Sequence, residues 1–441
     1  MKKIYLLFGL MLFIAACSSD LDQAPPNIAS SDSLTDFAGV LNAAYFYQHA
    51  SVTPMAVMGD FRADNALMEE EPYPAFDRFN SDLADGTLND QFFRPFYAAL
   101  YKSILSANTV INNSSNETDI GEAKFLRALA YFKLVLMFGD VTVNLSDAPS
   151  TTDTSILARQ PVADVYNNVI IPDLQDAIAA LDNTSLSNDT GRASRLAAQG
   201  LLGKVYVHMG NFANAETHLG AVVNGAAGAG VSLLSDFSQI FGASNDLNDE
   251  IIFSKLISGS VPDEYGFSEF WEWFFGLDTK ALDPLDPSLI AAFDASEAGG
   301  DTDLRRAVTI DEATLASPKF PQTNGPDHDF IEMRLGDVIL LYAEALNENG
   351  STPAAITELN KIRTRAGLPN TTATTQAAVR TAIAEERRLE LAFEGHRWFD
   401  LVRTGTAQSV LGFSDSNYLL APIPISEITS SGGVIDQNPG Y

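Results

Sequence analysis

The 441-residue chain has a single cysteine, Cys17, which excludes any disulfide within it. Its five histidines are scattered and lack the spacing of a metal site. The sequence also contains no phosphate-binding glycine loop and no nucleophile elbow. Beyond residue 14, no apolar run is long enough to span a membrane. We therefore expect no cofactor and no bound metal, and a fold that packing alone stabilises.

Basic residues are also scarce. The chain has 27 Lys and Arg against 57 Asp and Glu, which gives a net charge of −30. A field of this sign repels nucleic acid and polyanionic ligands at long range. We therefore expect no nucleic-acid partner, and a neutral ligand rather than a sulfated or carboxylated polymer. Solubility in salty surroundings explains the charge equally well.

The first residues form a distinct pattern. Two lysines, an apolar run over residues 4–14 and two alanines precede Cys17. This order is typical of a secretory signal, and lipidation accounts for an unpaired thiol in an exported protein. We predict a lipoprotein signal peptide over residues 1–16 and an acylated tether over residues 17–35, with Cys17 as the lipidation site. An ordinary signal peptide that contains a cysteine by chance is the alternative.

Apolar residues recur at helical spacing through most of the remaining chain. The segments with this pattern are residues 37–47, 92–112, 120–138, 162–181, 193–209, 213–223, 335–347, 353–366 and 376–402. Strand-like runs are few, at residues 141–143, 251–253 and 419–425. The sequence therefore predicts a mainly α fold with little β structure.

Two stretches predict helical hairpins, because each has two helical patterns separated by a tight break at Gly210 or Gly350. In tetratricopeptide-type repeats, small residues let such paired helices approach, and each pair stacks on the next. The segment between the hairpins is rich in Gly, Asp, Pro and aromatics, which favours a functional role. We divide the chain into an N-terminal helical half (36–224), a loop-rich candidate ligand-binding segment (225–334) and a C-terminal helical part (335–441).

Residues 385–401 (EERRLELAFEGHRWFDL) carry the most specific pattern. On a helix, the glutamates form one acidic row with an arginine within reach of each end. These residues are Glu386, Glu390, Glu394, Arg387 and Arg397. Carboxylates beside His396 also favour acid–base catalysis or a metal site, but no second histidine lies one turn away. We favour a buried ion-pair network at a helix end.

The same run resembles the C-terminal signature of the SusD/RagB family, whose members carry a run like ERR-ELAFEGHRWFDLVRTG. Further elements of the family follow in order along the chain. They are GEAKFLRA with FGD (121–140), ARQPVADVY (158–166), GRA (191–193), RLGDVILLYAEALNE (334–348), LAPIP (420–424) and QNPGY (437–441). The resemblance covers almost the whole chain after the tether.

The resemblance implies a cell-surface lipoprotein of Bacteroidetes-type bacteria that captures a nutrient, usually a glycan. It implies a tetratricopeptide-like scaffold packed against a loop-rich half, lying as a lid over a SusC-type TonB-dependent outer-membrane transporter. The acidic residues that follow Cys17 are similar to the sequence by which such lipoproteins reach the outer face of the outer membrane. The family motifs identify the scaffold better than they identify the ligand site.

The densest aromatic cluster lies in the loop-rich segment, over residues 265–275. Aromatic planes cover the C–H faces of sugar rings, and polar side chains bond to their hydroxyls. We therefore predict Tyr265, Trp271 and Trp273 as ligand contacts and expect at least one tryptophan to be exposed. Core packing is the alternative for the cluster. Trp398 belongs to the scaffold motif and is not predicted as a contact.

A second candidate lies earlier in the chain, at Arg62, Asp64 and Asn65, with Tyr73 in the following loop. This stretch is similar to the family's early SDN element, and its side chains suit vicinal hydroxyls. A capped helix end or an internal ion pair explains the polar residues equally well.

These observations predict non-enzymatic capture of a neutral polysaccharide or its oligosaccharides. The aromatic density suits a β-glucan such as laminarin. Peptide capture is an alternative that the sequence does not exclude. A surface glycoside hydrolase, which needs two carboxylates across a cleft, is another, and a scaffold for other surface proteins is the third.

Overall fold

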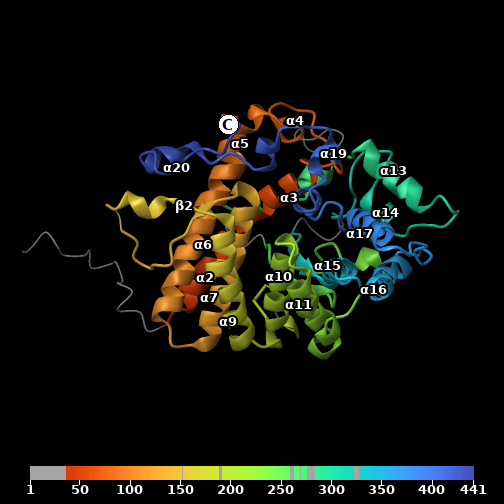
Figure 1. The fold of residues 1–441 in the computed structure, drawn as a ribbon, viewed down its shortest axis with the longest axis horizontal. Helices are drawn as coiled ribbons and strands as arrows, with labels where there is room; N and C mark the ends of the chain where they lie inside the picture. The colour runs from red at the N-terminus through yellow and green to blue at the C-terminus, as the bar shows by residue number, and fades with distance from the viewer. Residues whose placement is uncertain are drawn as a thin grey trace, which may run out of the picture.

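The computed structural model describes residues 36–150, 152–187, 191–258, 263–268, 270–275, 284–321 and 327–441. The predicted signal peptide, Cys17 and the tether lie outside these residues. Within them, helices dominate and the strands form two small antiparallel sheets. Figure 1 shows long helices side by side across the lower part of the molecule, with shorter elements above and to the right. The expected mainly α fold is confirmed.

The long helices form a continuous row, in which each one packs against the next. In chain order they are α2 (Ala38–Gln48), α6 (Arg94–Asn113), α7 (Glu117–Phe138), α9 (Ile171–Ala180), α10 (Arg195–His208), α11 (Phe212–Gly225), α15 (Leu335–Glu348), α16 (Thr352–Arg365) and α17 (Gln376–Leu391). The two hairpins predicted from the sequence are α10–α11 and α15–α16, and they stack directly on each other. The row is therefore longer than the two hairpins that the sequence predicts.

Glycines let neighbouring helices of this row approach closely. A Cβ on Gly203 of α10 would lie 2.5 Å from Leu219 of α11, and a Cβ on Gly220 would lie 3.1 Å from Tyr342 of α15. Gly210 closes the α10–α11 turn with a φ of +67°, which glycine adopts without steric cost. Small residues at the helix contacts thus explain why these hairpins pack tightly.

Shorter elements occupy the segments between the long helices. They are η2 (His49–Ser51), α3 (Val52–Asp60), α4 (Ala75–Arg78), η3 (Ser81–Ala84), α5 (Gly86–Leu88), η5 (Thr154–Leu157), α8 (Val162–Val165), η7 (Thr184–Ser187), η8 (Ala227–Ala229), η9 (Phe237–Gln239), α12 (Glu272–Phe275), α13 (Pro287–Ser296), α14 (Arg306–Thr309), α18 (Arg397–Arg403), α19 (Ala407–Leu411), η11 (Ser416–Leu419) and α20 (Ile425–Ser430). Most of the elements between α11 and α15 are short, in keeping with the irregular segment expected there. The division at residues 224 and 334 stays a prediction.

Each sheet has two antiparallel strands. In the first, β1 (Val141–Thr142) pairs with β2 (Arg159–Gln160), and in the second, β3 (Ile251–Lys255) pairs with β4 (Phe330–Arg334). The second pair joins residues 251–255 of the irregular segment to its last residues, and β4 leads directly into α15. Strand β4 was not predicted, and the expected strand over residues 419–425 is not one. Two prolines in that run, Pro422 and Pro424, lack the N–H groups that a ladder needs.

Two π-helical turns precede long helices of the row. The turn η4 (Asn89–Phe93) leads into α6, and η6 (Tyr166–Ile170) leads into α9. Each of these helices carries a proline in its first turn, Pro95 or Pro172. Proline cannot donate to the carbonyl four residues earlier and its ring displaces that carbonyl, so the turn widens. The turn η4 lies at the candidate site described below.

Residues 376–402 were expected as one helix, but the chain breaks between α17 and α18. At the break, the backbone N–H groups of Phe393 and Gly395 donate to the carboxylate of Asp60, at 3.0 and 2.8 Å. A Cβ on Gly59 would lie 2.2 Å from the carbonyl carbon of Gly395, so the two backbones are in direct contact. Docking of α3 therefore ends α17, and periodicity along one helix could not reveal it.

Candidate functional site

The acidic row of the signature is buried in an ion-pair network. Its glutamates meet cations from several distant segments. The pairs are Arg305–Glu386 (2.7 Å), Arg334–Glu390 (2.6 Å), Lys319–Glu394 (2.6 Å) and Arg365–Glu390, and Glu250 and Asp303 complete the network. Burial opposes ionisation of Glu390, but the surrounding arginine charges outweigh it and hold its pKa well below the usual range. The predicted ion-pair network is confirmed.

The arginines expected at the ends of the row pair elsewhere. Arg387 binds Asp337 at 2.8 Å and Asp400 at 2.9 Å, and Arg397 binds Asp64. That expectation was wrong because the cations of the network come from other segments. The nearby His396 lies 3.4 Å from Lys204, and burial lowers its pKa to about 4. The signature therefore serves the scaffold.

The second predicted cluster is also part of the scaffold. Asp64 accepts two hydrogen bonds from Arg397, at 2.7 and 2.9 Å, and pairs with Arg388 at 3.3 Å. Burial acts to raise the pKa of Asp64, but these two cations together lower it. Asn65 is fully buried and donates to Asp60 at 2.8 Å. The alternative of an internal ion pair is thus confirmed for Asp64.

Arg62 is fully buried between two aromatic rings. Its guanidinium lies 5.0 Å from the ring centre of Phe79 and 4.8 Å from that of Trp398. It donates to the carbonyl oxygens of Phe76, at 2.8 Å, and Tyr418. Burial lowers its pKa to about 10. These contacts use Arg62 to join distant segments, and a ligand role for it stays a prediction that the structure does not favour.

Both predicted tryptophans are buried, with exposed fractions of 5% for Trp271 and 2% for Trp273. The expectation that at least one would be exposed was wrong. Trp271 donates its indole N–H to the carbonyl of Ser268 at 3.0 Å. Trp273 packs edge-on against Tyr73, with ring centres 5.2 Å apart. Both indoles therefore pack inside the protein, where Trp273 contacts the ring of Tyr73.

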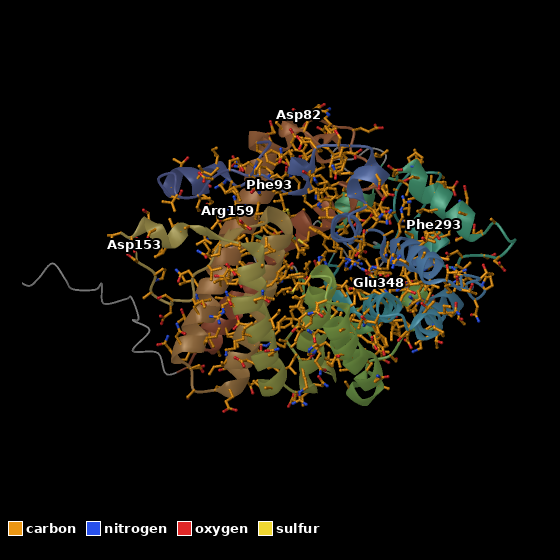
Figure 2. All side chains as sticks on the ribbon, in the orientation of Figure 1. Asp82, Phe93, Asp153, Arg159, Phe293 and Glu348 are labelled. Atoms are coloured by element: carbon orange, nitrogen blue, oxygen red, sulfur yellow. The ribbon has the colours of Figure 1, made fainter. Side chains whose placement is uncertain are left out.

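Tyr73 is the predicted contact that lies at a surface hollow. Its ring is half-buried and its hydroxyl donates to the side-chain oxygen of Gln91 at 3.2 Å. Gln91 lines a shallow, wide-open hollow in the surface together with Asp85, Gly86, Thr87 and Asp90. Tyr73 adjoins this hollow through its bond to Gln91. In Figure 2, Asp82 of the same loop lies at the upper edge of the molecule, with Phe93 beneath it.

The local backbone explains how the hollow presents its polar groups. Asp85 caps α5, accepting from the N–H of Thr87 at 2.7 Å. The π-helical turn η4 carries Asp90 and Gln91 outward while Phe92 and Phe93 are fully buried beneath them. A rigid, buried floor of aromatic rings thus supports exposed carboxylate, hydroxyl and amide groups. Such groups suit hydrogen bonding to sugar hydroxyls, and the partly exposed ring of Tyr73 suits a sugar C–H face.

The lining of the hollow is acidic. Asp85 and Asp90 are both exposed there. The cations of this stretch are already paired, Arg78 with Glu71 and Arg94 with Asp90. The surroundings of the hollow therefore present excess negative charge to a ligand.

Sequence reasoning missed the residues that line the hollow, which are Asp85, Thr87, Asp90 and Gln91. Aromatic density was the sequence feature used to predict ligand contacts, and in this protein the densest aromatic cluster consists largely of buried rings. A usable signal was the polar run 85–91 directly before the apolar pair Phe92–Phe93. Tyr265, the remaining predicted contact, is half-buried and lies beside Phe46 rather than at the hollow.

Two further observations concern the described residues. No group of three or more His, Cys, Asp or Glu side chains among them could hold a metal ion. Nor is any helix of this part of the chain long and apolar enough to cross a membrane.

Two sequence models of one family match this chain. The model described as "SusD family" matches residues 309–441, and the model described as "Starch-binding associating with outer membrane" matches residues 17–207. The chain belongs to the SusD/RagB family. The resemblance noted in the sequence is thus confirmed, and the two matches include both ends of the helical row.

Relatives of known sequence and structure agree with this assignment. SusD-like protein P2 of Formosa agariphila is 26% identical over the full length of both chains, and a SusD-like protein of Bacteroides ovatus is 26% identical over 91% of this chain and 82% of its own. A SusD superfamily protein from Bacteroides vulgatus shares the fold, with a TM-score of 0.76, 22% identity, and coverage of 92% of this chain and 99% of its own. A structure described as a laminarin-binding SusD-like protein has 26% identity, a TM-score of 0.73 and the same coverage.

Proposed function

We propose that this protein captures a neutral glycan of the β-glucan type, such as laminarin, at the cell surface without cleaving it. The observation that carries the proposal is the open hollow beside Tyr73. Its polar lining and aromatic edge match the two chemical needs of a sugar ring. Capture of this kind is an equilibrium binding step, followed by release to a transporter.

The relatives support the choice of ligand. The laminarin-binding SusD-like protein covers 92% of this chain at 26% identity. A surface glycan-binding protein A from Bacteroides fluxus shares the fold, with a TM-score of 0.73 at 21% identity. The excess negative charge around the hollow favours an uncharged polymer over an anionic one.

The geometry of the hollow favours binding over hydrolysis. A glycoside hydrolase needs one protonated and one ionised carboxyl group on opposite sides of the scissile bond. Asp85 is engaged in capping α5, and Asp90 is paired with Arg94 at 3.1 Å. We therefore propose a binding protein that delivers its glycan to a SusC-type TonB-dependent transporter, anchored through lipidated Cys17 on the outer membrane.

Calorimetric titration with laminarin tests the site. We expect Tyr73→Ala and Gln91→Ala each to weaken binding about 10-fold, which corresponds to ~1.4 kcal/mol. Tyr73→Phe should retain most of the affinity, since it keeps the ring that covers the sugar face. Tyr342→Ala, at a half-buried tyrosine of the helical row, is the matched control and should bind like wild type. Wild-type affinity in Tyr73→Ala and Gln91→Ala would refute this site.

The anchoring proposal has its own test. Cys17→Ala should leave laminarin affinity in solution unchanged, because Cys17 is the first residue of the predicted tether and precedes the folded part. The Cys17→Ala protein should no longer be retained at the cell surface, as measured by protease accessibility on intact cells and by cell fractionation. Retention of Cys17→Ala at the surface would exclude Cys17 as the anchor.

A further inference from the structure

A small aromatic cluster lies at the edge of the hydrophobic core, and none of its members lines the hollow. It consists of Phe46 and Tyr47 at the end of α2 and Tyr265 from the irregular segment. The ring centres of Phe46 lie 5.8 Å from Tyr47 and 6.1 Å from Tyr265. All three side chains are partly exposed. Tyr265 packs against the hydrophobic core, whereas Phe46 and Tyr47 are not among the described residues that do so.

The backbone beneath this cluster is held firmly. The ring nitrogens of His49 each lie 3.0 Å from a carbonyl oxygen, Nδ1 from that of Phe46 and Nε2 from that of Leu256, and the neutral imidazole donates to one of them. Thr53 donates to the carbonyl of Gly266 at 2.6 Å. These bonds fix the end of α2 to the segment that carries Tyr265.

The turn that presents Tyr265 is organised by one carboxylate. Asp263 accepts from the backbone N–H groups of Tyr265, Phe267 and Ser268, at 3.2, 2.9 and 3.1 Å. It also accepts from the hydroxyl of Ser268 at 2.5 Å. A turn that is ordered before binding loses little conformational entropy when a ligand contacts its tip. Tyr265 is therefore a preorganised side chain rather than one on a loose loop.

The cluster carries polar groups at its edge. Neither the Tyr47 nor the Tyr265 hydroxyl bonds to another described residue, while Lys102 lies over the Tyr47 ring at 5.6 Å from its centre. Lys102 is exposed and forms no ion pair within the part of the chain that the structure describes. Aromatic faces edged by free hydroxyls and an ammonium group suit a sugar, whose rings carry both C–H faces and hydroxyls.

One chain segment connects this cluster to the hollow. Tyr265 and Trp273 are eight residues apart, so their Cα atoms lie at most about 29 Å from each other. Trp273 in turn contacts Tyr73 at the edge of the hollow, with ring centres 5.2 Å apart. An extended polysaccharide of modest length therefore spans the distance between the two aromatic positions.

We infer that Tyr47 and Tyr265, supported by Phe46, form a second glycan contact, which gives the protein a preference for long chains. The inference rests on the proposed glycan binding at the hollow. A polysaccharide that occupies the hollow presents its next sugars to this cluster at high effective concentration, so a weak second contact raises affinity measurably. A disaccharide that occupies the hollow alone gains nothing from it.

Calorimetric titration with laminari-oligosaccharides of increasing length tests the second contact. Wild type should bind longer chains more tightly, and Tyr265→Ala and Tyr47→Ala should each weaken binding of the longest chain by about 5-fold or more. Both variants should bind laminaribiose like wild type, whereas Tyr73→Ala weakens binding at every length. Tyr342→Ala again serves as the control, and thermal unfolding of each variant reports whether it folds.

Hydroxyl-radical footprinting gives a readout that needs no substitution. Saturating laminarin should protect Tyr47 and Tyr265 from oxidation and leave Tyr342 unchanged. Unaltered length dependence in both tyrosine variants, or unprotected Tyr47 and Tyr265, would overturn this inference while leaving binding at the hollow intact. If this surface contacts a protein partner instead of a glycan, laminarin should leave Tyr47 and Tyr265 unprotected. No binding of laminarin of any length by wild type would refute the proposed function and this inference together.

Discussion

Single residues decide how the C-terminal signature meets the rest of the chain. Gly59 at the end of α3 and Gly395 after α17 touch backbone to backbone, and Asp60 caps the turn between them. Burial raises the pKa of Asp60 to about 6, against the bonds that it accepts. The junction thus depends on two residues without side chains and one buried carboxylate.

Gly59→Ala should destabilise the protein by about 3 kcal/mol or more, since the added Cβ meets backbone atoms that cannot turn away. Gly39→Ala is the matched control, because nothing lies within 4 Å of its Cβ position in α2. Alanine favours a helix over glycine, so that control should be neutral or slightly stabilising. Urea unfolding of both variants measures the difference. Equal stability of Gly59→Ala and wild type would show that the contact is looser than described.

The residue scale also shows how the predicted ligand contacts lie relative to the candidate site. Tyr73 was predicted, and it lies at the hollow because Trp273 and Phe92 support its ring. The two tryptophans were misjudged, because aromatic density in a sequence does not distinguish a buried floor from an exposed platform. Asp85 and Gln91 were missed because their exposure depends on a capped short helix and a π-helical turn.

At the scale of elements, periodicity predicted the long helices well. It predicted α10, α11, α15 and α16 with small errors at their ends. It failed where contacts with distant segments determine the local structure, as at the break after α17. Strand β4 was also missed, because its pairing with β3 comes from a segment that precedes it by more than 70 residues.

The ion-pair network around α17 predicts acid sensitivity. Burial disfavours ionisation of Glu390, Glu394 and Asp400, yet nearby cations lower the pKa of each. In the unfolded chain these groups take up protons near pH 4.5 and 3.8, while the folded protein resists doing so. Their stabilisation is therefore complete above this range and is lost progressively as the pH falls below it, toward the lower pKa values of the folded protein. Asp60 acts oppositely, adding stability as the pH falls from about 6 to 4.

We thus expect the free energy of unfolding in urea to fall steeply below pH about 4.5. Glu390→Gln should lower stability at pH 7 by about 3 kcal/mol or more, since it leaves buried arginines underpaired. The same variant should show a shallower loss in acid. An exposed pair, Arg78–Glu71, offers the control, and Glu71→Gln should follow the wild-type curve. A wild-type curve that is flat down to pH 3 would contradict this assignment.

At the scale of the whole molecule, charge should select the ligand. The chain carries a net charge of −30, and the cations near the hollow, Arg78 and Arg94, are already paired with carboxylates. Carboxymethylated β-glucan has the same backbone as its neutral parent and differs in charge. It should bind at least about 10-fold more weakly at low salt, a difference of ~1.4 kcal/mol. The difference in affinity between the two polymers should become smaller as salt screens the repulsion.

Titration of both polymers at low and high ionic strength measures this selectivity. Glu69→Lys combined with Glu70→Lys should make this difference in affinity smaller, because both side chains are exposed and the two changes reduce the net negative charge of the chain. Equal or tighter binding of the charged polymer by wild type would show that the acidic surface serves solubility alone.

The central claim is that the hollow beside Tyr73 holds a neutral glycan, and a crystal structure of the protein with a laminari-oligosaccharide tests it most directly. We predict density for a sugar ring against Tyr73, with its hydroxyls bonded to Gln91, Asp85 or Thr87. A ligand bound elsewhere with this hollow empty, in crystals where no neighbouring molecule covers it, would contradict the claim.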